Sequence, residues 1–339
     1  MKGTYPYRFL LLFILLITSF AINISFGSVD IPFSTTVKEL FTGVASNESW
    51  SYIIREYRLP KAFTAILVGS GLSLSGLLMQ TLFRNPLAGP FVLGISSGAS
   101  LGAAFLIMGS GVFALGVFLV NDISLAVASS IGSILVLLAV IAMARKVKDT
   151  MALLIIGLMF GSITAAVVTV LSYFAKAEEL QQYIYWSFGT VGNLSSSQVF
   201  LLTVICILGL LLSILSIKSL NALLLGENYA KSLGVRIKRA RFLIILATGL
   251  LAGSVTAFAG PIAFIGLAVP HLTRQLFNTT DHKILVPGVI VYGAILLLIC
   301  DTIAQLPGSS YVLPINAITS IVGAPIVIWL LVRKRKMIF

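Results

Sequence analysis

The residues of this chain that could perform bond chemistry are few. Only 10% of the 339 residues are charged, and there are two histidines and two cysteines. His271 and Asp301 fall inside or beside apolar segments, where an ionisable group is a candidate functional residue. An intramembrane enzyme would need a convergent set of such groups, and this pair alone does not make one. We expect His271 to bond a carbonyl of a neighbouring helix and Asp301 to lie near water at a helix end.

The remaining candidates for chemistry point away from catalysis. Cys206 and Cys300 both fall in apolar segments without zinc-like spacing, so we expect two buried small side chains. No Gly-x-x-x-x-Gly-Lys-Ser/Thr phosphate loop occurs anywhere in the sequence. We therefore expect no catalytic residue, no cofactor and no metal site, and any use of nucleotide must take place on another chain.

The most informative polar segment runs from Gly226 to Val235, between two long apolar runs. Its pattern predicts a short amphipathic helix that Gly226 and Gly234 would terminate. Glu227 near the start would favour the positive end of the helix dipole. One side would carry Tyr229, Ala230 and Leu233, and the other Glu227, Lys231 and Ser232. Such a helix either docks on another protein or lies on lipid headgroups.

The elements that position these residues are apolar segments of membrane-spanning length. A hydrocarbon core of ~30 Å needs about 20 apolar residues per helix, and lipid forces such segments to be helical. The sequence predicts one all-α unit over residues 1–339, with no separate soluble domain. The expected spans are 9–26, 62–82, 91–108, 123–144, 151–174, 197–217, 241–259, 261–277, 284–303 and 314–332. The start of the fourth span is ambiguous because 112–120 is also apolar.

The net charge of +12 follows the membrane topology and does not indicate nucleic-acid binding. If the N-terminus is cytoplasmic and the chain alternates, cytoplasmic segments hold 18 of the 23 basic residues. The five on the outer side are Lys38, Arg55, Arg58, Lys61 and Lys176. This asymmetry follows the positive-inside rule. We therefore expect a multi-pass protein of the cytoplasmic (inner) membrane with both termini in the cytoplasm.

A series of short motifs is more specific than this architecture. Ala88-Gly89-Pro90 and Ala259-Gly260-Pro261 also open two spans on opposite membrane faces, as an inverted repeat requires. The motifs, in order, are Arg58-Leu59-Pro60-Lys61, Ser75-Gly76 with Gln80, Arg84-Asn85-Pro86-Leu87-Ala88, Leu93-Gly94 with Ser97-Gly98-Ala99, the Gly226–Gly234 segment, Gly260-Pro261-Ile262-Ala263-Phe264-Ile265-Gly266-Leu267, Pro270-His271 with Arg274, Asp281-His282-Lys283, Asp301, and Gly323-Ala324-Pro325. Nearly end to end, this series resembles the FecCD-type permeases, the membrane subunits of ABC importers for iron-siderophores, haem and cobalamin.

The resemblance implies a type II ABC importer permease with ten transmembrane helices in inverted-repeat halves. It would form a homodimer or a paired heterodimer, with two ATPase subunits below and an extracytoplasmic substrate-binding protein above. Transport would use alternating access at the dimer interface, with no enzymatic activity in this chain. An iron-siderophore complex is the expected cargo, with haem and cobalamin as alternatives. An ion-coupled secondary transporter is a further alternative, although charged residues near the midplane are sparse.

The resemblance also implies roles for particular residues. The loop 219–238 would couple to the ATPase through Gly226, Glu227, Tyr229, Ala230, Leu233 and Gly234. Arg58 and Lys61 would pair with acidic residues of the binding protein, although snorkelling to the lipid surface would also explain them. The family usually has Arg at the second position, and a further basic residue near position 305, where this chain has Gln305. The docking face is therefore expected to be weaker or differently distributed.

A cytoplasmic gate is the third site that the resemblance implies. Its residues would be Asn85, Pro86, Leu87, Thr150 and Met151. Ordinary turn and helix-start chemistry would explain Asn85 and Thr150 equally well. On the outer side, an aromatic group would form either an interfacial belt or a lining of the substrate vestibule. Its members are Tyr183, Tyr185, Trp186 and Phe188.

Overall fold

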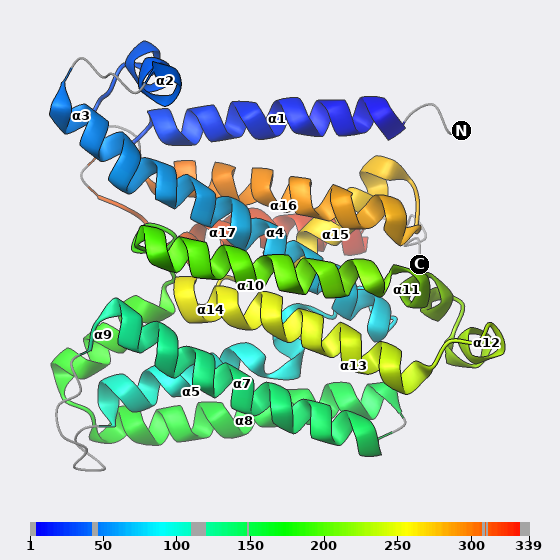
Figure 1. Cartoon of the computed structure of the whole chain (residues 1–339). Coiled ribbons are helices and arrows are strands. Elements are labelled where there is room, and N and C mark those ends of the chain that lie inside the picture. Colours follow the sequence, from blue (N-terminus) through cyan, green and yellow to red (C-terminus); the bar gives the residue numbers. More distant parts are fainter. Residues whose placement is uncertain are drawn as a thin grey trace.

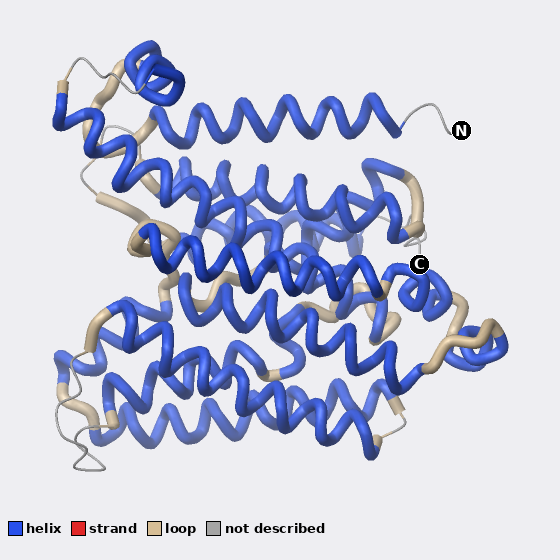
Figure 2. The backbone as a smooth tube through the Cα atoms, in the orientation of Figure 1, coloured by secondary structure: helices blue, strands red, loops and turns tan. Residues whose placement is uncertain are grey.

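The computed structural model describes residues 5–42, 47–109, 120–147, 149–306, 309 and 311–332. Across these residues the chain is made of helices joined by loops, with no strand (Figure 2). The apolar segment 112–120, which made the start of the fourth span ambiguous, lies outside the described residues except for Val120. The described part of the fourth span begins at a capped helix N-terminus. The side chain of Asn121 accepts a hydrogen bond from the amide of Ser124 and caps the helix that follows.

All ten predicted spans are occupied by helical segments, whose axes run side by side (Figure 1). Seven of the described helices are long and apolar enough to cross a membrane by length and composition, and two shorter apolar helices accompany them. The spans are α1 (Tyr5–Ser25), α4 (Leu59–Leu82), α5 (Ile95–Met108), α7 (Asp122–Lys146), α8 (Thr150–Phe174), α10 (Ser196–Leu215), α13 (Ile237–Thr248) continued through η3 (Gly249–Gly253) into α14 (Ser254–Ala259), α15 (Ile265–Phe277), α16 (His282–Ala304) and α17 (Ile315–Val332).

Most of the shorter helices lie at the two ends of the bundle (Figure 1), whereas η2 (Pro90–Leu93) packs against α8 inside it. We call the end that holds α12 (Glu227–Ser232) the α12 end, and the opposite end, with residues 26–33, 188–195, 304–306 and 311–314, the Lys61 end. The predicted outer loop 27–61 is itself largely helical, since the helix that contains α4 already begins at Glu48. The short helices are α2 (Phe33–Thr42), α3 (Glu48–Tyr52), η1 (Ile53–Arg58), η2 (Pro90–Leu93), α9 (Ala177–Ser187), α11 (Ile217–Leu224) and α12.

Helix α4 lies at the centre of the bundle and packs against α10, α13, α15 and α16. Glycines allow its backbone to touch its neighbours. A Cβ placed on Gly69 would lie 2.2 Å from the carbonyl oxygen of Gly293, and one on Gly76 would lie 1.7 Å from that of Gly266. Neither position can hold a side chain without moving a helix. Small residues at helix contacts are how membrane helices approach closely where lipid supplies no hydrophobic drive.

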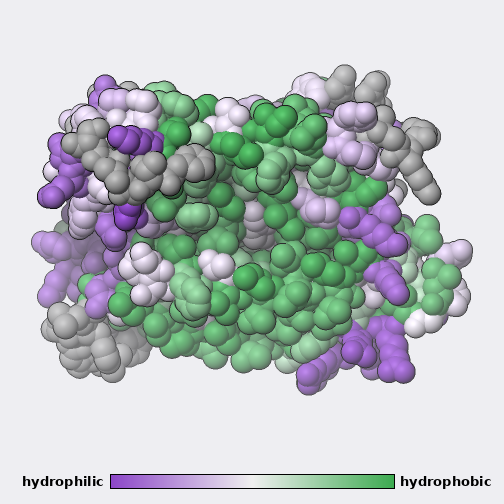
Figure 3. Space-filling view, turned by 45° about the horizontal axis from the view of Figure 1, so that its top comes forward, coloured by the Kyte–Doolittle hydropathy of each residue, from purple (hydrophilic) through white to green (hydrophobic). Residues whose placement is uncertain are grey.

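The helix contacts repeat between the two halves of the chain. Helix α5 packs on α7 as α15 packs on α16, and α4 packs on α16 as α13 and α14 pack on α7. The two Ala-Gly-Pro motifs precede α5 and α15, and the two helices begin close together inside the bundle, since a Cβ added at Gly266 would lie 2.9 Å from Pro90 Cδ. The outside of the molecule carries a broad hydrophobic band between hydrophilic ends (Figure 3). The chain is an all-α polytopic membrane protein built from inverted-repeat halves.

Candidate functional sites

At the α12 end, a three-residue contact fixes α12 to two spans. Arg241, at the start of α13, donates from Nη2 to Glu227 Oε1 at 2.5 Å and to Thr150 Oγ1 at 2.9 Å. The Thr150 hydroxyl, in the first turn of α8, donates to the same Glu227 oxygen at 2.8 Å. Arg241 is 5% exposed, so its charge is nearly withdrawn from water. Glu227, Arg241 and Thr150, which we call the coupling triad, therefore hold α12, α13 and α8 together.

Helix α12 has the boundaries that its glycines predict. Gly226 (φ 101°) precedes it and Gly234 (φ 83°) follows it, both in the left-handed half of backbone space that glycine enters most easily. The predicted apolar side, however, is only partly buried within this chain. Ala230 is fully buried, whereas Tyr229 and Leu233 are more than half exposed. Tyr229 lines a cavity of about 880 Å³ whose wall also includes Thr150 and Met151.

The predicted gate residues separate into two places. Thr150 and Met151 lie beside α12, and the residue that caps α8 is Asp149, whose side chain accepts a bond from the Met151 amide. The Thr150 hydroxyl therefore does not cap the helix and donates to Glu227 instead. Asn85, Pro86 and Leu87 form a turn after α4, in which Asn85 Oδ1 accepts a bond from the Leu87 amide at 2.9 Å.

The turn at Asn85–Leu87 is tied to α15 by a histidine. His271 Nε2 lies 2.8 Å from the carbonyl oxygen of Pro86, so this nitrogen carries the proton and donates. Next to it, buried Arg274 donates to Gln80 Oε1 at 2.6 Å and joins α15 to α4. His271 therefore bonds a backbone carbonyl, as the sequence led us to expect, but that carbonyl belongs to a turn and not to a neighbouring helix. The contact positions the turn, whose gating role remains a prediction.

At the Lys61 end, Arg58 is turned into the protein. Its guanidinium donates to the carbonyl oxygens of Ile24 at 2.9 Å, Ser25 at 2.7 Å and Val29 at 2.5 Å. Only 7% of the residue is exposed. These bonds satisfy carbonyls left open where α1 ends. Arg58 does not snorkel here, and a docking role, which remains a prediction, would require residues 24–29 to release it.

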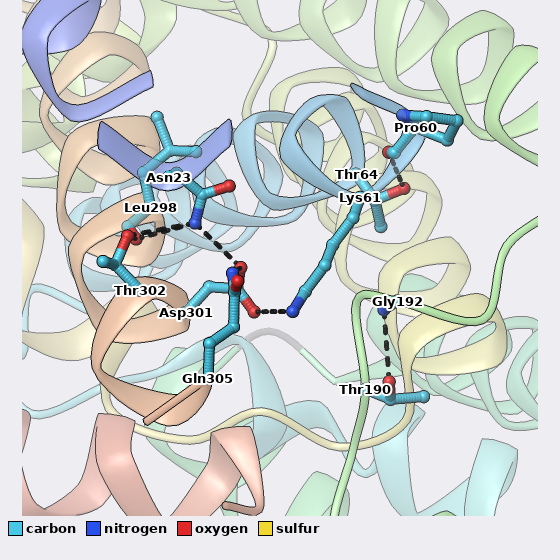
Figure 4. Close-up of polar contacts among 10 residues, drawn as sticks. All are labelled: Asn23, Pro60, Lys61, Thr64, Thr190, Gly192, Leu298, Asp301, Thr302 and Gln305. Atoms are coloured by element: carbon cyan, nitrogen blue, oxygen red, sulfur yellow. Dashed lines mark hydrogen bonds and ion pairs between the residues drawn. The ribbon is translucent and has the colours of Figure 1, made fainter. Parts of the chain in front are cut away.

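Lys61 lies opposite a buried carboxylate (Figure 4). Its Nζ is 3.2 Å from Asp301 Oδ1, while Asp301 Oδ2 accepts bonds from Asn23 Nδ2 at 2.8 Å and Gln305 Nε2 at 2.7 Å. Asp301 is 2% exposed. The expectation that water reaches Asp301 was wrong, because α1, α4 and α16 close around it. We call Asn23, Lys61, Asp301 and Gln305 the Lys61 cluster.

Three members of the Lys61 cluster, Lys61, Asp301 and Gln305, form part of the wall of a cavity of about 700 Å³. Two of the four predicted aromatic residues, Tyr185 and Phe188, lie on the same wall. Tyr183 instead bonds Ser100 through its hydroxyl at 2.6 Å, and Trp186 borders a different cavity. The aromatic group is therefore divided between several surfaces, and part of it lines this cavity. Both cysteines are buried and unpaired, as expected.

Sequence reasoning missed three residues of these sites, Asn23, Arg241 and Gln305. Arg241 counted only as one more basic residue near a span, and Gln305 only as a missing charge. Each carried a usable signal, since a polar group among apolar neighbours must find a partner when it is buried. The sequence alone does not say which partner, because Arg241 and Thr150 are 91 residues apart.

The comparison that decides the family covers almost the whole chain. Residues 14–333 match the model of the FecCD transport family. This chain belongs to the FecCD transport family. The resemblance of its motifs to the FecCD-type permeases is thereby confirmed, and with it the architecture of a type II ABC importer permease.

Individual relatives agree with the family match. The FecCD chain is 38% identical over 283 residues to the vitamin B12 import system permease protein BtuC of Salmonella paratyphi A, covering 83% of this chain and 84% of the relative. The BtuC of Citrobacter koseri is also 38% identical, over 282 residues and 83% of each chain. These relatives are transport permeases, and this chain is a permease of the FecCD/BtuC type.

Solved structures share the fold. A structure described as an inward-facing conformation of a metal-chelate type ABC transporter superimposes with a TM-score of 0.81 at 28% identity, covering 98% of this chain and all of the other. PsaBC from Streptococcus pneumoniae, solved with a Fab, gives a TM-score of 0.51 at 17% identity over 90% of this chain and 98% of the other. The second match supports the fold alone.

Proposed function

We propose that this FecCD chain is the membrane-spanning permease subunit of an ATP-driven importer for an iron-siderophore complex. Its substrate would pass between outward- and inward-open states at an interface between two permease copies or between two paired permeases. Both termini would lie in the cytoplasm, which makes the α12 end cytoplasmic and the Lys61 end external. The charge asymmetry of the loops supports this orientation.

The coupling triad is the observation that carries the proposal. A helix that receives force from an ATPase must be firmly attached to the spans that move, and α12 is attached to α8 and α13 by a buried arginine. Tyr229 and Leu233 leave an apolar surface exposed on the same helix. That surface would seat in a groove of an ATPase subunit, two of which would serve a pair of permeases. Movement would reach Thr150 and Met151 first, and these residues would narrow the inner exit together with Asn85, Pro86 and Leu87.

At the opposite end, the 700 Å³ cavity would receive the substrate-binding protein. Lys61 supplies a positive charge on its wall, and Tyr185 and Phe188 supply apolar surface. An acidic residue of the binding protein would pair with Lys61, and with Arg58 if residues 24–29 release it. Lys61 presents a point charge without the fork that lets arginine hold a carboxylate in two places, so orientation would depend on the surrounding surface.

Cobalamin is the second candidate substrate, because the relatives at 38% identity are named as vitamin B12 permeases. A reconstitution experiment separates the candidates. The permease, its ATPase and its binding protein would be placed in liposomes with ATP inside, and uptake of a ferric siderophore and of cyanocobalamin would be compared. We expect ATP-dependent uptake of the ferric siderophore. Uptake of cyanocobalamin alone would reassign the substrate, and uptake driven by an ion gradient without ATP would overturn the proposal.

A further inference from the structure

We propose that Asp301 is an internal competitor for the charge of Lys61, so that docking of an acidic partner exchanges one carboxylate for another. The ammonium group of Lys61 would pair with Asp301 in the undocked permease and with a carboxylate of the partner after docking. This inference rests on the proposed docking at the Lys61 end and assigns a regulation to it. Asp301 would then set how tightly the partner binds.

Lys61 and Asp301 form an ion pair, but the Lys61 side chain remains partly exposed. Lys61 Nζ faces a single oxygen of Asp301 at 3.2 Å (Figure 4), a longer contact than the Arg55–Glu39 pair at 2.6 Å and the Arg241–Glu227 pair at 2.5 Å. The Lys61 side chain is 19% exposed and the Asp301 side chain 3%. The buried partner is therefore the fixed one, and the partner that reaches the cavity is the one with a flexible stem.

Asp301 would keep two hydrogen-bond donors if Lys61 moved away. Its other oxygen, Oδ2, accepts hydrogen bonds from Asn23 at 2.8 Å and from Gln305 at 2.7 Å. A buried carboxylate without any partner would be strongly destabilised, whereas one that keeps two amide donors remains hydrogen-bonded. Gln305 therefore has a specific part here: it holds Asp301 in place and adds no charge that would hold Lys61 more tightly or repel it.

Lys61 has room to change partners. Its aliphatic stem passes Gly192, where an added Cβ would lie 3.7 Å from both Cδ and Cε of the lysine. The stem thus runs along backbone, with no side chain from position 192 in its way. The cavity of about 700 Å³ begins at this point, and Asn193 and Tyr57 stand on its wall. Arg58 differs in each respect, since three carbonyls hold its guanidinium.

The test compares binding of the purified substrate-binding protein to the permease–ATPase complex in nanodiscs. Asp301→Asn keeps the shape and the amide contacts but removes the competing charge, so the Kd should fall by about fivefold, the upper range for an exposed ion pair. Lys61→Ala should weaken binding. In the Lys61→Ala background, Asp301→Asn should have no further effect. Asp122→Asn is the matched control, because Asp122 is also an acidic residue at the Lys61 end but is exposed and distant in sequence.

A second measurement tests the Lys61–Asp301 pair in the absence of the substrate-binding protein. Acetylation of Lys61 by a membrane-impermeant amine reagent, followed by mass spectrometry, should be slow in the wild-type complex and several-fold faster in Asp301→Asn, with exposed Lys176 as the reference. Equal labelling, or an unchanged Kd in Asp301→Asn while the wild type binds, would overturn the competitor role alone. If the wild-type complex does not bind the protein at all, the docking proposal itself fails, and the exchange fails with it.

Discussion

At the scale of residues, the coupling triad holds a charged side chain, Arg241, in a nearly buried position, where this chain has few charges. Arg241 is nearly buried at the start of a span, and its guanidinium reaches Glu227, Thr150 and the carbonyl oxygen of Val147. An arginine bound to two elements at once transmits displacement between them, because moving either one breaks charge-assisted bonds in a weakly solvated place. The triad is therefore more than an anchor for α12.

Replacing Arg241 with alanine should uncouple the permease. The carboxylate of Glu227 would lose its ion pair, and removal of one partner of a largely buried pair costs about 3–5 kcal/mol at most. We expect substrate uptake to fall at least about tenfold, while ATP hydrolysis by the assembled complex stops responding to the loaded binding protein. Uptake and ATPase assays in liposomes would measure this. Lys231→Ala, which alters an exposed charge on the same helix, should stay within about twofold of wild type.

The state of Glu227 also predicts a pH dependence. Burial alone would raise the pKa of Glu227, but the bonds from Arg241 and Thr150 outweigh it and hold the pKa below its usual 4.5. A depressed carboxyl pKa stabilises the folded state above the unfolded pKa, and the contribution disappears as the pH falls through the folded pKa. The Tm difference between wild type and Glu227→Gln should therefore be constant from pH 8 to about pH 5.5 and close below 4.5. A difference that closes near neutral pH would contradict this assignment.

Residue types were easier to predict than residue partners. The composition gave good reason to expect buried cysteines, and His271 does bond a carbonyl. The same reasoning was wrong for Asp301. Its position near a helix end predicted exposure to water, whereas α1 packs over it and Asn23 donates to its carboxylate. The contact joins residues 278 positions apart, and no local pattern encodes it. Pairings of this kind depend on which helices are neighbours, and so become visible only in three dimensions.

At the scale of elements, the glycines around α12 show why so short a helix has sharp ends. Gly226 has φ 101° and Gly234 has φ 83°, values that cost an ordinary side chain about 1–2 kcal/mol. The sequence predicted both ends correctly, because glycine beside a polar helical pattern is a strong stop signal. It also predicted the ten spans, whose apolar length is set by lipid. It did not predict α2 and α3, since a short helix at a membrane surface leaves no long apolar run.

Changing Gly226 to alanine tests whether this backbone geometry matters for coupling. The new Cβ would sit in strained backbone and 3.5 Å from an Arg84 nitrogen, so α12 should shift from its place beside Arg241. We expect uptake to drop several-fold with normal amounts of protein in the membrane. Gly89→Ala is the matched control at the same end, because Gly89 has an ordinary φ of −89° and nothing within 4 Å of an added Cβ. Equal effects of the two substitutions would reject the argument.

At the scale of the whole molecule, the apolar exterior is interrupted on one side by hydroxyl groups. A cavity of about 450 Å³ lies between α5, α8 and the start of α17. Several of these groups already bond each other or backbone carbonyls, but a wall this rich in polar atoms suits a water-filled path or another protein chain better than the bilayer. The polar residues on its wall are Ser96, Ser97, Ser100, Thr164, Thr169, Tyr183 and Asn316. The opposite exposed surfaces, such as that of α10, carry large apolar side chains.

This asymmetry predicts which face meets a second permease copy. Single cysteines on exposed positions of α8 (Ile155, Met159, Ile163) and α17 (Ile321, Ile328) should give dimers with a bismaleimide in native membranes. The same reagent should leave cysteines on α10 (Leu201, Leu208) monomeric, because that helix would face lipid. Background reaction should be low, since Cys206 and Cys300 are buried. Cross-linking through α10 but not through α8 or α17 would place the interface on the other side, and the hydroxyl-lined cavity would then have to open toward something other than a path shared by two copies.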